Sequence, residues 1–305
     1  MRHFIDLWDF SYEQLQSIID YAIELKAQTK QGVWSDMGKN KSLSMIFEKN
    51  STRTRYSFEL AMKQLGGETI VTSSSDMQLG RGETLGDTAQ VLSRFVDAIM
   101  IRANSHKDVL ELAEHSNVPI INALTDFSHP CQIMADIMTW QEHVGDIKGK
   151  KMAWLGDGNN VCATLVMAAA LWGFELAIAT PKSYKVDAQV VAWALEHGGH
   201  ITQTENTDIA AKDADLIVTD AFVSMGDKNA KQRVSELMGY QVNEALMAKA
   251  KPNALFMHCL PAHRGEEVTD RVIDSMQSVV FDEAENRLHA QKAILCYCLG
   301  LGKFS

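Results

Sequence analysis

Short apolar runs, rich in β-branched residues, alternate along the chain with longer segments whose apolar positions have helical spacing. The short runs are typical of strands in a buried sheet, and the longer segments are typical of amphipathic helices. The predicted strands are Ser42–Phe47, Ala98–Ile101, Lys151–Leu155, Leu176–Ala179, Leu216–Val218 and Leu255–Met257. The predicted helices include Tyr56–Leu65, Leu85–Arg94, Ile133–His143 and Asp187–His197. This alternation predicts βαβ units and parallel sheets, and therefore an α/β fold.

The most polar break in this pattern is His143–Lys151, which contains Gly145 and Gly149. We place a domain junction there, because each half then has its own strand–helix pairs and 305 residues are enough for two cores. The expected domains are residues 1–145 and 146–286, each a parallel sheet flanked by helices. The final predicted helix, about Arg287–Leu299, is far in sequence from the first half, and the pattern leaves open whether it packs there.

Composition narrows the classes of function. The formal net charge of −10 opposes binding to nucleic acid, and it requires that any anionic substrate be bound by a local cluster of positive charge. No apolar run is long enough for a membrane span, and Asp6 interrupts the N-terminal sequence before a secretion signal can form. Five scattered cysteines do not suggest a disulfide framework. We therefore expect a cytoplasmic protein with small-molecule partners.

The segment Ser51–Arg55, with the sequence Ser-Thr-Arg-Thr-Arg, follows a predicted strand and precedes a predicted helix. Hydroxyl side chains cap helix N-termini, where exposed N–H groups favour an anion. Two arginines exceed what capping needs, since cations oppose the helix dipole at this end. They fit either a multiply charged anion bound between them and the helix, or a capped helix with solvated arginines.

Two further polar groups follow apolar runs in the same half of the chain. Arg102 comes directly after Ala98–Ile101, and His129–Gln132 (His-Pro-Cys-Gln) follows the apolar pair Ile120-Ile121. Ligands bind at the carboxyl ends of parallel strands in open α/β sheets. Three polar strand ends in one half therefore favour the anion site.

These segments resemble the family of aspartate and ornithine carbamoyltransferases. Ser51–Arg55, together with Phe58 and Glu59, is similar to the family's carbamoyl-phosphate signature, and His129–Gln132 is similar to its second signature. The resemblance extends from about residue 4 to residue 300.

The resemblance implies that each matching residue binds carbamoyl phosphate. Those on the phosphate are Ser51, Thr52, Arg53 and Thr54. The carbamoyl oxygen is contacted by Thr54, Arg102 and His129, and the carbamoyl amide is contacted by Gln132. Arg102 and His129 are then catalytic, because they would stabilise the oxyanion of a tetrahedral intermediate. The resemblance also implies a homotrimer in which Gln78 reaches the site of a neighbouring subunit.

The second half begins with a glycine-containing turn. Gly156–Asn160, with the sequence Gly-Asp-Gly-Asn-Asn, follows strand Lys151–Leu155 and precedes a helix. A dinucleotide site is disfavoured, because Val161 replaces the third glycine of that pattern and no acid ends the next strand. The asparagines are better suited to donate hydrogen bonds to a small carboxylate.

Asp220 follows the strand that contains Leu216–Val218, and Ser224-Met225-Gly226 comes shortly after it. An acid at this place can bind an ammonium group, and a glycine-containing turn can present N–H groups to a carboxylate, so the sequence predicts a receptor for an α-amino acid. Asp220–Gly226 also resembles the D-x-x-x-S-M-G signature of the ornithine-specific branch. The residues that hold the amino acid in that branch correspond to Asn160, Asp220, Ser224 and Met225.

His258–Pro261, with the sequence His-Cys-Leu-Pro, resembles a further motif of that branch. A nucleophilic Cys259 would need a base in contact, and a zinc site lacks a recognisable ligand spacing. The resemblance instead implies that Cys259 is catalytic, near the reacting amine, and that Cys259 and Leu260 lie close to carbamoyl phosphate. It also implies that Arg287 contacts the carbamoyl amide, which requires the C-terminal helix, about residues 287–305, to return to the first domain.

The resemblance implies transfer of the carbamoyl group of carbamoyl phosphate to the δ-amine of L-ornithine, giving L-citrulline and phosphate in arginine metabolism. Neither a metal nor an organic cofactor is expected, and both halves of the chain should contribute to one site. Aspartate is disfavoured as the acceptor, because Asp220 would repel its second carboxylate, and acetylornithine has no free α-ammonium group for this acid. Putrescine is harder to exclude. A non-catalytic binding relative and a nicotinamide-dependent oxidoreductase are the alternatives outside the family of transferases.

Overall fold

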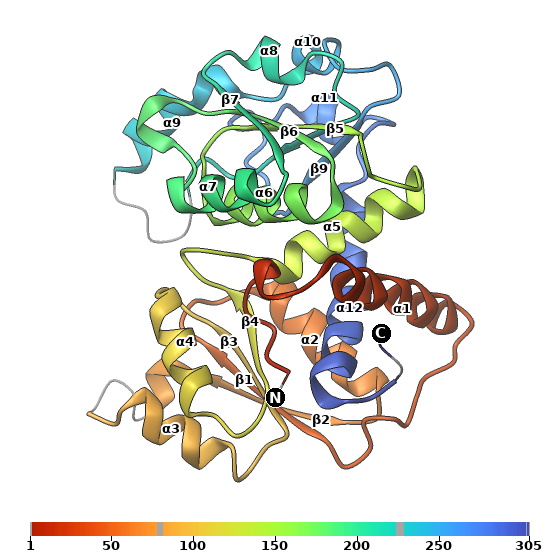
Figure 1. Ribbon diagram of the computed structural model, residues 1–305, viewed down its shortest axis with the longest axis vertical. Coiled ribbons are helices and arrows are strands. Elements are labelled where there is room, and N and C mark those ends of the chain that lie inside the picture. The colour runs from red at the N-terminus through yellow and green to blue at the C-terminus, as the bar shows by residue number, and fades with distance from the viewer. Residues whose placement is uncertain (1, 78–81, 224–228, 303, 305) are drawn as a thin grey trace. The chain divides into compact units, whose positions relative to one another are not determined.

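The structure is a computed structural model that describes residues 2–77, 82–223, 229–302 and 304. Contacts within the chain divide it into two compact units. Unit 1 comprises Met1–Met138 and Glu285–Ser305, and unit 2 comprises Thr139–Ala284. Each unit has a parallel sheet with helices on both sides (Figure 1). The division falls within two helices, α5 and α12.

The elements that lie in or enter unit 1 are η1 Leu7–Asp9, α1 Tyr12–Lys30, β1 Ser42–Phe47, α2 Thr52–Gln64, β2 Glu68–Ser73, η2 Ser74–Asp76, α3 Leu85–Leu92, β3 Ala98–Arg102, α4 His106–His115, β4 Ile120–Leu124, α5 Pro130–His143 and α12 Val280–Leu299. The other elements of unit 2 are β5 Lys151–Leu155, α6 Asn160–Trp172, β6 Glu175–Ala179, η4 Lys182–Tyr184, α7 Ala188–Glu196, β7 His200–Thr204, α8 Thr207–Ala211, β8 Leu216–Thr219, α9 Ala230–Leu237, η5 Met238–Tyr240, α10 Glu244–Met247, β9 Leu255–His258 and α11 Asp270–Ile273.

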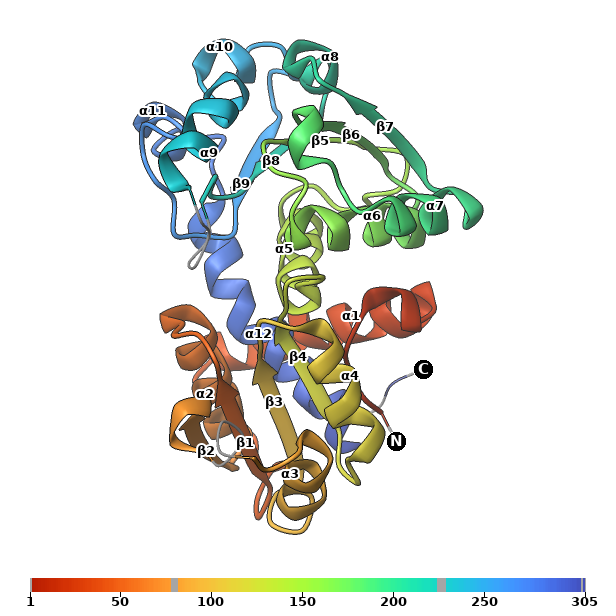
Figure 2. The same cartoon turned by 90° about the vertical axis from the view of Figure 1, so that its left-hand side faces the viewer.

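The sheet of unit 1 has the strand order β2-β1-β3-β4, and its pairings are parallel. Apolar side chains of α3 and α4, such as Ala89 and Leu112, pack against Ile46 and Ile99 on one face of the sheet. Helices α2 and α12 lie on the other side (Figures 1 and 2). The chain runs from β1 outward to β2 and then returns to β3, so the strand order reverses between β1 and β3. Ligands bind beyond the carboxyl ends of the strands at such a reversal.

The sheet of unit 2 has the order β7-β6-β5-β8-β9 and is also parallel. Helices α6 and α7 lie on one side of it, and α8 to α11 lie on the other (Figure 2). Its order reverses between β5 and β8, which makes the carboxyl ends of these two strands the expected ligand site. Helix α6 starts there, with Asn159 as its N-cap, and ends at Gly173 in the left-handed conformation with φ 69°.

The C-terminal helix belongs to unit 1 from Glu285 onward. Lys26 Nζ donates to the Asn286 amide oxygen at 2.8 Å, and Lys292 Nζ donates to the Thr29 hydroxyl at 2.7 Å. These bonds join α12 to α1, which lies more than 250 residues earlier in the chain. The expected return of this helix to the first half is therefore confirmed.

The α/β fold and the six predicted strands are confirmed, with ends that differ by at most one residue. The final helix begins at Val280, about two turns before the predicted start at Arg287. The pattern did not predict α1, β2 or β7. Strands β2 and β7 are edge strands with partly exposed side chains, so they lack the apolar run that marked the others. Helix α1 carries a capping box between Ser11 and Gln14, which was an available signal for its start.

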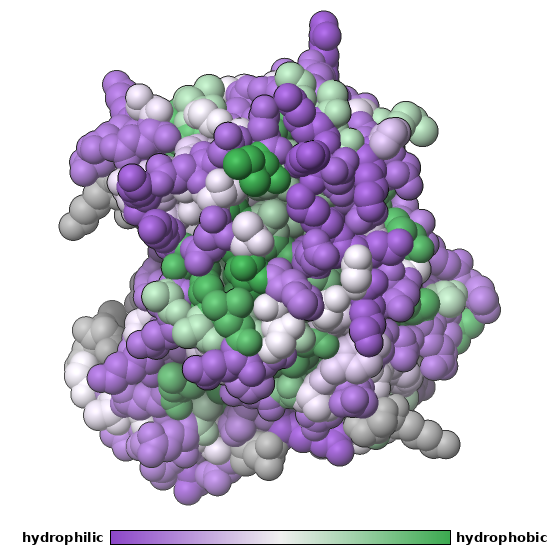
Figure 3. Space-filling view, turned by 45° about the horizontal axis from the view of Figure 1, so that its top comes forward, coloured by the Kyte–Doolittle hydropathy of each residue, from purple (hydrophilic) through white to green (hydrophobic). Residues whose placement is uncertain are grey.

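Hydrophilic residues cover most of the face shown in Figure 3, where hydrophobic residues gather in smaller groups. Within the described residues, no helix combines the length and the apolar character that a membrane span requires.

Candidate functional site

The N-terminus of α2 follows β1 at the strand reversal of unit 1. Ser51 is its N-cap, and the Ser51 hydroxyl accepts a hydrogen bond from Thr54 N at 3.3 Å. The two arginines of this turn differ in their surroundings. Arg55 is exposed and its Nε donates to Glu59 at 2.8 Å, whereas the partly exposed Arg53 side chain has no ion pair or hydrogen bond within the described residues. Arg53 is therefore the arginine better placed to bind an added anion.

The Thr54 hydroxyl is the meeting point of the unit 1 cluster. Its side chain is buried, with 1% of the residue exposed. Arg102 Nη1 at the end of β3 donates to Thr54 Oγ1 at 3.3 Å, and Arg287 Nη2 on α12 lies 3.5 Å from the same oxygen. The Ser51 hydroxyl lies 3.0 Å from it. Residues from three distant parts of the sequence, the start of α2, the end of β3 and α12, therefore meet at one hydroxyl.

Gln132 fixes the other side of the Arg287 guanidinium. Arg287 Nη1 donates to Gln132 Oε1 at 2.6 Å, and both residues are almost fully buried. Gln132 Nε2 donates to Asp136 at 2.8 Å, one turn later on α5, which holds the amide oxygen toward Arg287. The oxygens of Thr54 and Gln132 are neutral, so these contacts orient the guanidinium groups and leave their positive charge for an anion.

His129 lies directly before α5 and is 4% exposed. Burial lowers its pKa well below the usual 6.5, and the positive charges of Arg287 and Arg102 lower it further. The imidazole is therefore neutral at neutral pH, where one ring nitrogen can donate a hydrogen bond. The preceding Ser128 is fully buried, its hydroxyl donates to Asp6, and it accepts from Asn122 Nδ2 at 2.9 Å. These bonds anchor the loop that carries His129.

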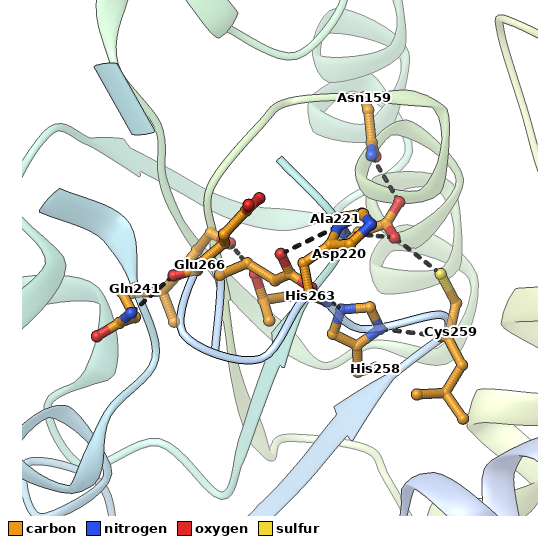
Figure 4. A network of polar contacts seen from close by, with 12 residues as sticks. Asn159, Asp220, Ala221, Gln241, His258, Cys259, His263 and Glu266 are labelled. Carbon is orange, nitrogen blue, oxygen red and sulfur yellow. Dashed lines mark hydrogen bonds and ion pairs between the residues drawn. The ribbon is translucent and has the colours of Figure 1, made fainter. Parts of the chain in front are cut away.

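In unit 2 the carboxylate of Asp220 lies between two donors at the strand reversal. Asn159 Nδ2 donates to Asp220 Oδ2 at 2.8 Å, and the thiol of Cys259 donates to Asp220 Oδ1 at 3.0 Å (Figure 4). Asn159 can do this because its own Oδ1 caps α6 by accepting from the N–H groups of Val161 and Cys162. Asp220 is therefore oriented by side chains that follow β5 and β9.

The glycines of the turn after β5 have a structural cause. Gly156 has φ +122°, a conformation that other residues rarely adopt. A Cβ atom on Gly158 would lie 2.3 Å from the backbone nitrogen of Val186, and Gly158 N donates to Tyr184 O at 2.8 Å. Residues 184–186 thus take the space beside this glycine, which supports the sequence argument against a dinucleotide site.

A buried histidine holds the turn after β9. His258 Nδ1 accepts from Leu260 N at 2.9 Å, so the proton is on Nε2, which donates to Glu267 Oε1 at 3.1 Å (Figure 4). Burial acts to raise the pKa of Glu267, but the hydrogen bonds from His258 and from the backbone of His263 bring it below its usual value overall. Leu260 has φ 55° and a cis peptide bond to Pro261. The hydrogen bond from Leu260 N to His258 spans the turn that carries Cys259.

Two groups of side chains in the described part of the chain bring three possible metal-ligand atoms within 4.8 Å of one another. They are Asp220, His258 and Cys259, and His263, Glu266 and Glu267. Hydrogen bonds within the protein already explain the positions of Asp220, Cys259, His258 and Glu267.

The structure thus brings the predicted residues together as two clusters, one in each unit. The unit 1 cluster contains Ser51, Thr52, Arg53, Thr54, Arg102, His129, Gln132 and Arg287. The unit 2 cluster contains Asp220, Cys259 and Leu260, with Asn160 at the start of α6. Gln78, Ser224 and Met225 lie outside the described residues. The prediction gave Asn159 only as a donor to a small carboxylate, whereas the structure has it donate to Asp220. The prediction overlooked Asp136, which lies one turn after Gln132 on α5, and Glu267, whose contact with His258 depends on the fold.

Comparisons with known proteins match the two halves of the chain to two domain families. Residues 2–142 match the family described as "Aspartate/ornithine carbamoyltransferase, carbamoyl-P binding domain", and residues 148–298 match "Aspartate/ornithine carbamoyltransferase, Asp/Orn binding domain". The chain is 58% identical over 305 residues to an ornithine carbamoyltransferase of Brucella abortus, with 99% of this chain and 98% of that protein covered. It is 55% identical over 300 residues to one of Agrobacterium fabrum, with 98% of each covered.

The chain is also similar to solved structures of ornithine carbamoyltransferases. The ornithine carbamoyltransferase of Pyrococcus furiosus matches with a TM-score of 0.95 at 50% identity, covering 99% of this chain and 98% of that one. The anabolic ornithine carbamoyltransferase of Campylobacter jejuni matches with a TM-score of 0.92 at 41% identity, covering 98% and 99%.

Proposed function

Because the chain belongs to the aspartate/ornithine carbamoyltransferase family, we propose that it transfers the carbamoyl group of carbamoyl phosphate to the δ-amine of L-ornithine, giving L-citrulline and phosphate. The observation that carries this proposal is the buried Thr54 hydroxyl contacted by both Arg102 and Arg287. The buried guanidinium of Arg287 and the partly buried one of Arg102, both on neutral oxygens, form a receptor for a small anion that has its own hydrogen-bonding groups.

Carbamoyl phosphate is proposed to bind at the unit 1 cluster, in the domain of residues 1–145 with the C-terminal helix 287–305. Its phosphate would lie at the N-terminus of α2, where Ser51, Thr52 and Thr54 offer hydroxyl groups and Arg53 a charge-assisted pair. Its carbamoyl oxygen would accept from Arg102, His129 and Thr54. A neutral His129 suits this role, because it can donate to the oxygen without adding a third positive charge to those of Arg102 and Arg287.

Ornithine is proposed to bind at the unit 2 cluster, in the domain of residues 146–286. The Asp220 carboxylate, held by Asn159 and Cys259, would pair with the α-ammonium group. Asn160, together with Ser224 and Met225, would hold the rest of the amino-acid head and leave the δ-amine free. Cys259 and Leu260 would lie near the reacting groups.

In the reaction the neutral δ-amine attacks the carbonyl carbon and a tetrahedral oxyanion forms. Phosphate then leaves with the electron pair of the broken C–O bond, and the attacking nitrogen gives up one proton to the departing phosphate. Arg102, His129 and Thr54 would stabilise the oxyanion, since one preorganised donor is commonly worth about 3 kcal/mol. Arg53 and the hydroxyls of Ser51 and Thr52 would stabilise the departing phosphate. The residues of the two clusters can supply each of these roles, so the proposal invokes no metal or organic cofactor.

The experiment that tests the proposal compares phosphate release by the purified protein with ornithine, putrescine, aspartate, lysine and acetylornithine as acceptors. We expect a strong preference for ornithine, because it alone of these combines a free α-amino acid head with an amine at the δ position. A preference for putrescine would assign the chain to diamine carbamoylation, in which Asp220 would bind the distal ammonium. If the protein is folded and binds carbamoyl phosphate but releases phosphate with none of these acceptors, it is a non-catalytic relative.

Two finer features are also proposed. The first is a homotrimer in which Gln78 reaches a neighbouring site, which sedimentation would detect as a species of about three times the 33.9 kDa chain mass. Gln78→Ala should then lower activity without changing the mass of the trimer. The second is a cytoplasmic location, which agrees with five cysteines that are all free thiols.

A further inference from the structure

Gln291 lies one turn after Arg287 on the same face of α12. It is fully buried, and Arg287 is only 3% exposed. Residues four apart on a helix are neighbours, so the two side chains are within reach of each other. No sequence pattern marks Gln291 as a site residue, and it has no role in the proposed reaction.

The chemistry of the two side chains fixes the orientation of the Gln291 amide. A guanidinium has only donors, so the amide oxygen must face it, because the amide nitrogen would place donor against donor. In that orientation the Gln291 oxygen accepts from Arg287 Nη2 at 2.8 Å and from Nε at 3.1 Å. The amide nitrogen then donates to the Ser57 hydroxyl.

Ser57 continues this chain of hydrogen bonds into α2. Its hydroxyl donates to the backbone oxygen of Arg53 at 2.7 Å and lies 3.2 Å from that of Thr54. One buried amide thus connects Arg287 to the turn of α2 that carries Arg53 and Thr54. Gln132 holds Nη1 from the other side, so the guanidinium plane is fixed at both ends.

We infer that Gln291 is a positioning residue of the proposed carbamoyl-phosphate site, a neutral clamp that orients Arg287 without reducing its positive charge. The inference rests on the proposed function. A carboxylate in the same place would hold the guanidinium equally well but would add a negative charge beside the bound dianion. The amide therefore satisfies two requirements at once, which are fixed geometry and full charge.

Two variants separate these requirements. Gln291→Met keeps the length and burial of the side chain but has no strong acceptor, so Arg287 loses two hydrogen bonds. We expect the Kd for carbamoyl phosphate, measured by calorimetry, to rise five- to 20-fold and the melting temperature to fall. Gln291→Glu keeps the acceptors and should melt at or above the temperature of Gln291→Met, yet it should bind carbamoyl phosphate more weakly than Gln291→Met. A purely structural residue would not make stability and affinity change in opposite directions.

The matched control is Thr29→Val, which removes the acceptor of the buried Lys292 on the same helix and leaves Arg287 untouched. It should lower the melting temperature and leave the Kd for carbamoyl phosphate within twofold of the wild-type value. In every variant the KM for ornithine at saturating carbamoyl phosphate should also stay within twofold. If Gln291→Met binds carbamoyl phosphate as tightly as the wild type does, the inference about Gln291 is wrong and the proposed function still stands. A wild-type protein that does not bind carbamoyl phosphate would overturn the proposed function as well.

Discussion

The thiol of Cys259 donates a hydrogen bond to the carboxylate of Asp220 at 3.0 Å, although the two residues belong to different strand ends of unit 2. The same carboxylate accepts from Asn159 on its other oxygen. Cys259 therefore has a partner that orients it as a donor, and that partner is an acid and not the histidine beside it in sequence. This geometry supports a binding and positioning role for Cys259 and argues against a nucleophilic role.

Substitution of Cys259 tests this role. Cys259→Ala removes one of the donors to Asp220, and a hydrogen bond to a charged group is worth about 1.5–3 kcal/mol, so kcat/KM for ornithine should fall roughly 10- to 100-fold. Cys259→Ser retains a donor in the same place and should lose much less activity. Steady-state kinetics of the two variants would measure this difference. Equal and complete inactivation of both variants would instead favour chemistry that needs the sulfur atom.

Arg53 and Arg55, the two arginines at the N-terminus of α2, allow a substitution and its matched control. Arg53→Ala should raise the KM for carbamoyl phosphate by at least tenfold, because the proposed pair with the phosphate is lost. Arg55→Ala should change it less than threefold, because Arg55 is exposed and already pairs with Glu59. Initial rates at varied carbamoyl phosphate would check both. Unchanged affinity in Arg53→Ala would place the phosphate elsewhere.

Thr54→Val removes the hydroxyl that Arg102 and Arg287 share while it conserves side-chain volume. The buried Arg287 and the partly buried Arg102 then lose an acceptor, so the free energy of unfolding should fall by about 1–3 kcal/mol and carbamoyl transfer should fall by at least tenfold. Denaturant unfolding and steady-state kinetics of Thr54→Ser, which keeps the hydroxyl, provide the comparison. A stable and active Thr54→Val would show that the shared hydroxyl has no such role.

The stability of unit 1 should depend on pH through His289. Burial is the main cause that lowers its pKa from 6.5 to about 4. Between these values the unfolded chain binds a proton that the folded chain does not, so stability falls as pH decreases from 6.5 to 4. The stability lost once His289 is fully protonated is about 3 kcal/mol. Melting temperatures from pH 7 to 4.5 should fall less steeply in His289→Gln than in the wild type.

The rate of transfer should rise with pH above neutrality. The attacking amine must be neutral, and an alkyl ammonium has a pKa of about 10.4, so deprotonation costs about 4 kcal/mol at pH 7.5. A positively charged, desolvated site lowers that pKa and thus moves the rise toward neutral pH. His129 should not add a second transition above pH 6.5, because its pKa is lowered well below that value. A flat profile of kcat/KM for ornithine from pH 6 to 10 would contradict this account.

The sequence predicted the parts of the fold and site that depend on local pattern. Strands buried on both faces have apolar runs, so β1 and β5 were found, whereas the edge strands β2 and β7 have polar positions and were not. Polar residues at the end of a strand or directly after it, such as Arg102 and Asp220, were found because the apolar run before them marks the strand.

Contacts between residues distant in sequence could not be predicted in this way. The string Asn159-Asn160 contains two amides, and only the fold shows that Asn159 contacts Asp220 while it caps α6. Gln291 resembles any other polar residue of a helix until Arg287 and Ser57 are seen beside it. The roles of these residues depend on partners that only the folded chain brings near them.

The central claim is that the chain joins a carbamoyl group to the δ-nitrogen of ornithine. The most direct test mixes the purified protein with L-ornithine and carbamoyl phosphate labelled at its carbonyl carbon, and follows the label by NMR. The account predicts that the label appears in the ureido group of citrulline, with one phosphate released for each citrulline formed. Label that remains in carbamoyl phosphate, or that appears only as its hydrolysis products while the protein is folded and saturated with both compounds, would contradict it.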